Sequence, residues 1–202
     1  MTKIDSPFYE ILSRNDSSDG RYLQIVRDAA GSAGGRFRWR DLSWAVEVNV
    51  APPLELAIAR PGRSQDYCRD IQGSVPVLSM RAAAALKPVV ESDVEFIPAK
   101  IEGASEELVV INIRSSVVCV DENRTEYVRK WTGDSIRPDL VGEYKELWGL
   151  VIDPTAAKGH HIFRLWGAHT HIVVSQEVVN IFDVLNLTGA KFVDVSSAHW
   201  MK

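Results

Sequence analysis

The stretch "GHHIFRLWGAHTHIVVSQEVVNIF", residues 159–182, predicts two strands followed by a helix. Its apolar runs at 162–167 and 171–175 follow the similar run "LWGLVID" (147–153) at hairpin-like spacing, which favours antiparallel strands. Farther along, "KFVDV" (191–195) has the composition of one more strand. The second half of the chain therefore predicts a sheet with a helix before its last strand.

The helix in this stretch has clear start and end signals. Ser175 is a good N-cap, and Glu177 places negative charge in the first turn, where the helix dipole favours it. Its predicted buried stripe has the spacing i, i+4, i+7 and consists of Val178, Phe182 and Leu185. We expect the helix to end near Asn186, because Gly189 suits the left-handed conformation in which helices often terminate.

Elsewhere the chain predicts further strands and one more helix. The expected strands are 8–12, 21–26, 54–59, 94–102 and 107–120. A polar, turn-forming run at 13–20 favours a hairpin of the first two strands. The side chains of 107–120 alternate between two faces, of which we expect one to be core. The second helix should begin after Ser79 and end before Pro88, because proline disrupts a helix interior.

Composition limits both the fold class and the function. Strands outnumber the helices, so the predicted class is α+β, a mainly antiparallel sheet with two or more helices packed on it. The 202 residues fit one domain, and a net charge of −4 gives no basic footprint for nucleic acid. No apolar run approaches the ~18 residues of a membrane span, so we expect a cytoplasmic protein. In that compartment Cys68 and Cys119 should be free, buried thiols.

The quoted stretch also contains four of the five histidines, namely His160, His161, His169 and His171. His169 and His171 would share one face of a strand, an arrangement found in metal sites, with Asp153 or Asp183 as a hypothetical third ligand. A metal-binding or small-molecule-binding protein, or a hydrolase, using this pair is therefore one alternative. The competing interpretation is that the histidines lie in connections around structural elements, and the chain contains no established nucleophile or phosphate-binding motif that favours an enzyme.

The segment 121–146 is polar, and it is rich in acidic side chains: Asp121, Glu122, Glu126, Asp134, Asp139, Glu143 and Glu146. One interpretation is a solvated face of mixed charge. The other is a loop surface that attracts a cationic protein, because complementary charge speeds association. Tryptophans are the residues that most often anchor interfaces, and the chain has six: Trp39, Trp44, Trp131, Trp148, Trp166 and Trp200.

A series of motifs occurs in order through the second half of the chain. They are "PVLSMRAAAAL" (76–86), "DVEFIPAKIEG" (93–103), "VVINIRSSVVCVDENRTEY" (109–127), "RPDLVGEY" (137–144), "LVIDP" (150–154), "IFRLWG" (162–167), "IVVSQEVVNIF" (172–182) and "TGAKFVDV" (188–195). In this order they resemble the eleventh of the numbered bacterial polymorphic-toxin immunity-protein families. On that basis residues 75–202 are the family-like α+β core, and residues 1–74 are an N-terminal strand and loop region packed as part of one domain.

The resemblance implies an immunity protein that binds a cognate bacterial toxin and neutralises it by stoichiometric occlusion. Such a protein has no catalytic turnover and needs no cofactor, and neither nucleic acid nor membrane is an expected partner. For a basic toxin, we expect the interface to include four acidic loop residues: Glu122, Glu126, Asp134 and Asp139. A general interaction module outside toxin systems is the remaining alternative.

Overall fold

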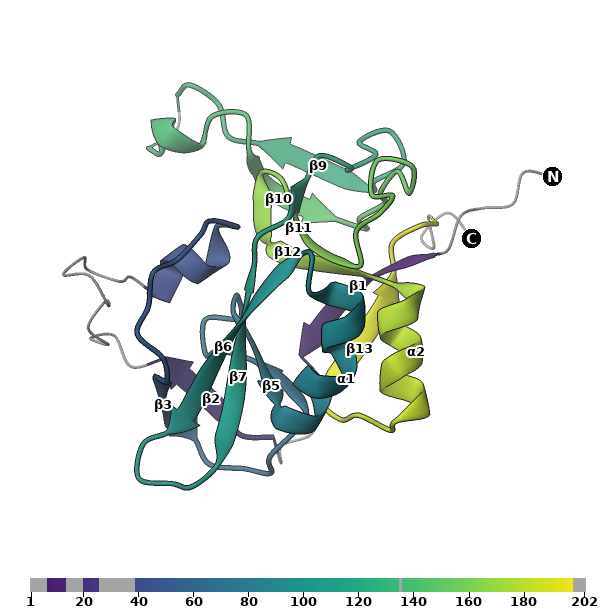
Figure 1. The fold of residues 1–202 in the computed structure, drawn as a ribbon. Helices are drawn as coiled ribbons and strands as arrows, with labels where there is room; N and C mark the ends of the chain where they lie inside the picture. Colours follow the sequence, from purple (N-terminus) through teal and green to yellow (C-terminus); the bar gives the residue numbers. More distant parts are fainter. Residues whose placement is uncertain (1–6, 14–19, 26–38, 135, 198–202) are drawn as a thin grey trace.

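The computed structural model describes residues 7–13, 20–25, 39–134 and 136–197, whose strands form three sheets (Figure 1). The first sheet has the order β13-β1-β12-β11-β8, and only the pairing of β8 with β11 is parallel. Its strands are β1 (Phe8–Ser13), β8 (Ser116–Val117), β11 (Ile162–Leu165), β12 (Ala168–Ser175) and β13 (Ala190–Asp194). The quoted stretch thus supplies the two strands that we predicted, at the centre of this sheet.

The second sheet has six strands in the order β2-β3-β6-β7-β5-β4, and only β3 and β6 pair in parallel. These strands are β2 (Tyr22–Ile25), β3 (Leu54–Arg60), β4 (Tyr67–Arg69), β5 (Pro76–Ser79), β6 (Val94–Ile101) and β7 (Glu107–Ile113). A third sheet consists of β9 (Tyr127–Lys130) and β10 (Tyr144–Trp148) alone. Short 3-10 helices occupy Trp39–Ser43 (η1) and Pro138–Leu140 (η2).

The two strands at the N-terminus do not form the expected hairpin. β1 pairs with β12 and β13 in the first sheet, whereas β2 pairs with β3 in the second. The polar run that we interpreted as a hairpin turn therefore connects two different sheets. The hairpin prediction was wrong because an apolar alternation marks a strand without specifying its partner.

β7 is buried on both faces, where we predicted a single core face. Ile111 and Ile113 belong to a hydrophobic cluster that also contains residues of both α-helices, and Val110 belongs to a second cluster together with Leu54 and Val77. The expected strand 107–120 is also interrupted after Ile113, before the two-residue strand β8. β7 therefore separates two of the three hydrophobic clusters formed by the described residues.

The helices α1 (Met80–Val90) and α2 (Gln176–Val184) lie side by side, and Leu86 and Phe182 are among the residues that they bury in the first cluster (Figure 1). Ser79 caps α1 as predicted, since its hydroxyl accepts a hydrogen bond from the Ala82 amide. The prediction that α1 ends before Pro88 was wrong, because the helix continues through this proline.

The C-terminal end of α2 lies where we expected it, but with a different cause. Val184 is the last helical residue, and Asn186 has the left-handed backbone conformation (φ 49°) that we assigned to Gly189. Gly189 also has a positive φ, of 95°, at a different point of close approach. A Cβ atom there would overlap the carbonyl oxygen of Tyr67 in β4, so glycine is required for packing between segments.

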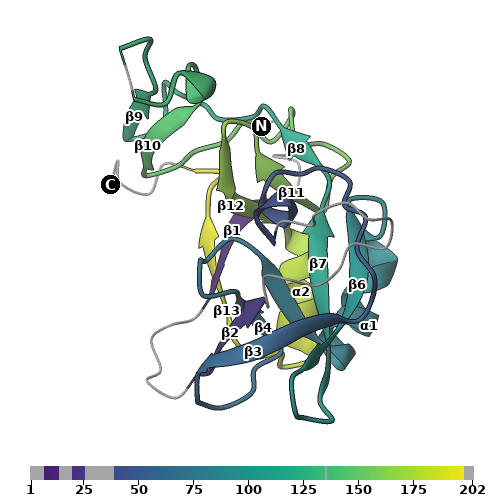
Figure 2. The same cartoon turned by 90° about the vertical axis from the view of Figure 1, so that its left-hand side faces the viewer.

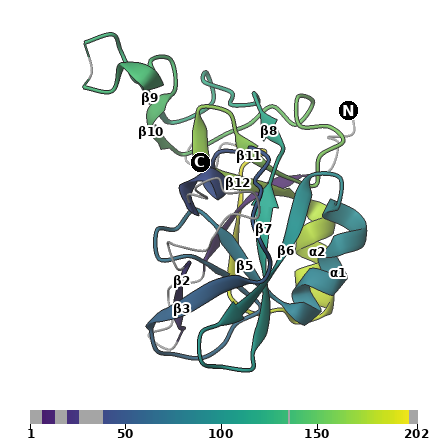
Figure 3. The same cartoon turned by 60° about the vertical axis from the view of Figure 1, so that its left-hand side comes forward.

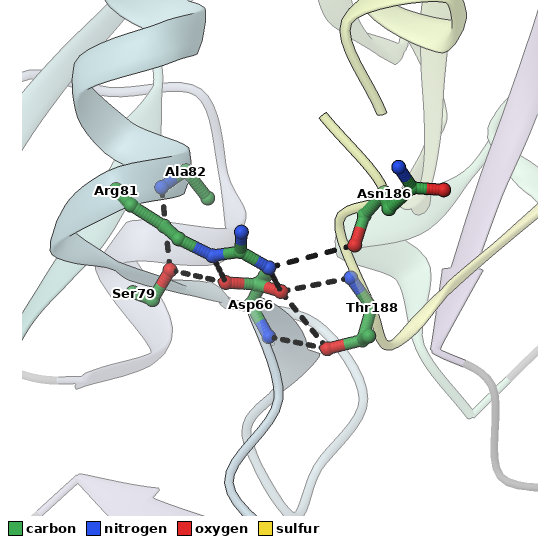
Figure 4. A network of polar contacts seen from close by, with 6 residues as sticks. All are labelled: Asp66, Ser79, Arg81, Ala82, Asn186 and Thr188. Atoms are coloured by element: carbon green, nitrogen blue, oxygen red, sulfur yellow. Dashed lines mark hydrogen bonds and ion pairs between the residues drawn. The ribbon is translucent and has the colours of Figure 1, made fainter. Parts of the chain in front are cut away.

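Asp66 joins the start of α1 to the loop between α2 and β13 (Figure 4). Its buried carboxylate accepts two hydrogen bonds from the guanidinium of Arg81, one from the Ser79 hydroxyl, and two from the amide and hydroxyl of Thr188. The bond from Arg81, supported by those from Ser79 and Thr188, holds the pKa of Asp66 well below its usual range. These contacts connect segments more than 100 residues apart in sequence.

The architecture agrees with the α+β class in coarse form, being rich in mostly antiparallel strands and having two α-helices. Three sheets replace the single sheet that we expected. Both cysteines are free and buried, as predicted, and burial raises the pKa of each thiol to about 12. Within the described part of the chain, no helix is long and apolar enough to cross a membrane.

Candidate protein-binding surface

His169 and His171 lie on β12 and have separate partners. Nδ1 of His171 lies 2.8 Å from Glu10 Oε1, whereas the half-buried ring of His169 packs against Trp44 with centroids 5.0 Å apart. Burial, and then the charge of Arg164, lower the pKa of His169. Among the residues that the structure describes, no group of three or more His, Cys, Asp or Glu side chains is arranged to hold a metal ion. The geometry therefore does not assemble the metal site that the spacing allowed.

His160 and His161 hold the start of β11 in place. Nδ1 of His160 lies 2.6 Å from Oδ1 of the buried Asp93, and Asp93 also accepts hydrogen bonds from the amides of His161 and Ile162. Nδ1 of His161 lies 3.0 Å from the Ser175 hydroxyl and 3.4 Å from Glu177. A serine-histidine-acid relay needs the serine and the acid on different ring nitrogens, so this cluster does not form one.

The segment 121–149 forms a projecting arm that contains β9, β10 and η2 (Figures 1, 2 and 3). At its base, the Thr125 hydroxyl exchanges hydrogen bonds with the backbone of Val151, and the Tyr144 amide donates to the Gly167 carbonyl. The strand expected at 147–153 ends at Trp148, because Gly149 has a left-handed backbone conformation (φ 56°). This break separates the arm from the body.

The two faces of the arm differ in their surroundings. Residues opposite each other in an antiparallel pair share a face, so Val128 and Leu147 form one face, the inner face, on which Leu147 packs against the hydrophobic cluster that contains Phe163. The other face, which we call the outer face, consists of Tyr127, Arg129, Glu146 and Trp148. Tyr127 and Trp148 contact each other edge to face, with ring centroids 6.5 Å apart. On the outer face Tyr127, Arg129 and Trp148 are exposed to solvent, and Glu146 is partly exposed.

All four predicted interface residues lie on this arm. Glu122 pairs with Lys130 at 2.6 Å and accepts a hydrogen bond from the Tyr144 hydroxyl, and these two bonds lower the pKa of Glu122. Asp139 pairs with Arg137, whose hydrogen bonds lower the pKa of Asp139. Glu126 and Asp134 are exposed and form no ion pair with any residue that the structure describes.

The arm has a small surplus of negative charge. It contains seven carboxylates and five cationic side chains, and each cation has a partner on the arm. Four of the cations form ion pairs, and Lys145 lies 4.7 Å from the centre of the Trp131 ring. The free carboxylates are therefore the charged groups with which a partner protein would form new contacts.

Sequence reasoning did not single out the exposed apolar side chains of the arm. Trp148 is 65% exposed, Tyr127 is 46% exposed and Ile136, near the tip, is 93% exposed. Trp148 was one of six candidate tryptophans, and nothing in its local sequence distinguished it from the others. Trp200 and the side chain of Trp39 lie outside the described residues. The signal that sequence reasoning missed was Gly149, which ends the strand and leaves Trp148 at its last position.

Comparison with known proteins gives one family. Residues 53–197 match the model of an immunity protein family (Imm11), a range that includes the whole arm, both α-helices and most of the two larger sheets. No curated protein matches the chain.

Proposed function

Because the chain belongs to the immunity protein family Imm11, we propose that it binds a cognate bacterial toxin and neutralises it by stoichiometric occlusion, without catalysis. The family match over most of the chain is the observation that carries this proposal. The structure supports it, because the described residues include a projecting arm whose exposed side chains suit a protein partner better than a small molecule.

The toxin-binding surface in this proposal is the arm, including Glu122, Glu126, Asp134 and Asp139. Asp134 and Asp139 differ in whether they are free to pair with a toxin. Asp139 already has a cationic partner, Arg137, whereas Asp134 has none among the described residues. Glu126 is similarly available, whereas Glu122 is held by Lys130. We therefore assign the main electrostatic attraction of a basic toxin to Glu126 and Asp134, with the two ion-paired carboxylates in a secondary role.

The test is co-expression with the toxin encoded beside this protein, followed by titration of the purified toxin. Wild-type protein should protect the cells, and toxin activity should fall linearly until the two proteins are equimolar. A toxin inactivated by far less than one equivalent would indicate catalysis and contradict occlusion. Cells that die despite high expression of this protein would refute the proposed function.

A further inference from the structure

The aromatic pair on the outer face is unusually exposed to solvent for side chains of this size. Trp148 and Tyr127 occupy opposing positions in the ladder, and about half or more of each side chain is in contact with solvent. Their edge-to-face contact fixes the two rings relative to each other before any partner arrives. An aromatic surface that is already ordered loses little conformational entropy on binding.

The hydrophobic packing of the arm sheet against the body lies on its inner face. Leu147 on the inner face packs against the body, and the Tyr144 amide donates a hydrogen bond to the Gly167 carbonyl. Among the described residues, the ring contact and the ion pair of the outer face are internal to it, joining Tyr127 to Trp148 and Arg129 to Glu146. A two-stranded sheet by itself is marginally stable in water. The sheet therefore gains from a partner that covers its outer face.

The charges around this face limit what that partner is. Arg129 and Glu146 form an ion pair at 2.9 Å, so the outer face has no net charge and its apolar part is the aromatic pair. The uncompensated carboxylates of the arm include Glu126, next to Tyr127 in the chain, and Asp134 near the tip. A complementary surface has an apolar recess bordered by lysine or arginine side chains.

On these grounds, and resting on the proposed function, we propose that Tyr127 and Trp148 are the anchor of the toxin interface. The indole and the phenol insert into an apolar recess on the toxin, and cationic groups at its border contact Glu126 and Asp134. The negative surplus of the arm opposes the two other occupants, which are a second copy of this chain and an anionic membrane. The carboxylates then contribute mainly to the association rate, whereas the aromatic pair determines the dissociation rate.

The test uses the full chain and the purified product of the neighbouring toxin gene. Trp148→Ala should raise the dissociation constant at least about 30-fold, mainly through faster dissociation, as expected for an interface hot spot. Val184→Ala is the matched control, because Val184 is 76% exposed at the end of α2, and its binding should equal that of wild type. Equal affinity of Trp148→Ala and wild type would overturn the anchor.

Further measurements distinguish a failure of the aromatic anchor from misfolding of the variant and from a failure of toxin binding itself. The melting temperature of Trp148→Ala should stay within a few degrees of wild type, since Trp148 is 65% exposed and its ring contact is with Tyr127 of the same arm. Independently of any variant, toxin binding should slow amide hydrogen exchange at 127–130 and 144–148, and unchanged exchange there would also overturn the anchor. If the wild-type protein does not bind the toxin at all, both the anchor and the proposed function are refuted. A dimer that Trp148→Ala dissociates, or binding of wild type to vesicles of anionic lipid, would identify a different occupant and overturn the proposal.

Discussion

Arg164 is a fully buried cation whose hydrogen bonds go to backbone carbonyls. Its guanidinium donates to the carbonyls of His169, Leu42 and Ser74 at 2.6 to 2.9 Å, and so connects β11 to η1 and to the loop before β5. Burial, and then the nearby charge of Arg69, lower the pKa of Arg164 to about 10, which leaves it charged at neutral pH. The arginine thus joins a strand of the first sheet to η1 and to the loop between β4 and β5 of the second sheet.

Arg164→Met should lower the free energy of unfolding by about 2–4 kcal/mol, because three backbone carbonyls lose a donor, and two of these hydrogen bonds are fully buried. Arg164→Lys should cost less, since an ammonium group still serves some of these acceptors. Urea unfolding of the three proteins measures the difference. A methionine variant as stable as wild type would show that these bonds add nothing to stability.

Asp93 predicts a dependence of stability on pH. Burial by itself would raise its pKa, but hydrogen bonds from His160, from the His161 and Ile162 amides and from Ser115 outweigh burial and lower it. A carboxyl group with a depressed pKa stabilises the fold above its unfolded pKa of about 3.9, and this contribution is lost as the pH falls through the folded value.

Asp93→Asn should therefore destabilise the protein by about 1–3 kcal/mol at pH 7, because an amide nitrogen replaces one acceptor oxygen. The difference from wild type should shrink as the pH falls below about 4, where the unfolded chain begins to protonate Asp93, and should be lost below the depressed pKa of the folded protein. Unfolding curves at pH 7, 5 and 3 test this. A gap of the same size at pH 3 and pH 7 would assign the effect to packing instead.

At the scale of elements, α1 tolerates Pro88 because of where the proline lies. It is the ninth of eleven helical residues, and the carbonyl that loses its donor belongs to Ala84, on the exposed side of the helix, where water can replace the bond. The following Val90 is buried in the first cluster and holds the last turn in place. We predicted that the helix ends before Pro88 because proline disrupts a helix interior. The packing of Val90 instead extends the helix past the proline.

Pro88→Ala should stabilise the protein by about 1 kcal/mol, because restoring the hydrogen bond to Ala84 exceeds the loss of proline's constraint on the unfolded chain. Thermal and urea unfolding should both show the gain, and the helical signal in circular dichroism should stay the same or rise slightly. A destabilised variant would mean that the ring of Pro88 is itself a packing contact.

Across the whole molecule, local features were predictable and long-range pairing was not. The cap at Ser79, most of the expected strands and the end of α2 follow from residues close in sequence, whereas the short strands β4, β5 and β9 were not expected. The pairing of Phe8 with Ser175 joins positions more than 160 residues apart, and no local turn specifies it. The same limit applies to the candidate surface: the acidic residues were visible in the sequence, but their neutralisation by Lys130 and Arg137 depends on how the arm folds.

Two pairs of charge-reversal variants separate the effect of where the negative charge lies from the effect of the total charge. Glu126→Lys with Asp134→Lys changes the net charge from −4 to 0, and so does Glu91→Lys with Glu102→Lys, a pair of exposed residues at the end of α1 and in the β6–β7 turn. If the arm attracts a basic toxin, the first pair should slow association about tenfold or more and flatten its dependence on salt, because the attraction acts within about one Debye length. The second pair, on the body of the protein, should have a much smaller effect. Stopped-flow association rates between 50 and 500 mM salt make the comparison, and equal slowing by both pairs would show that total charge, rather than the arm, controls the encounter.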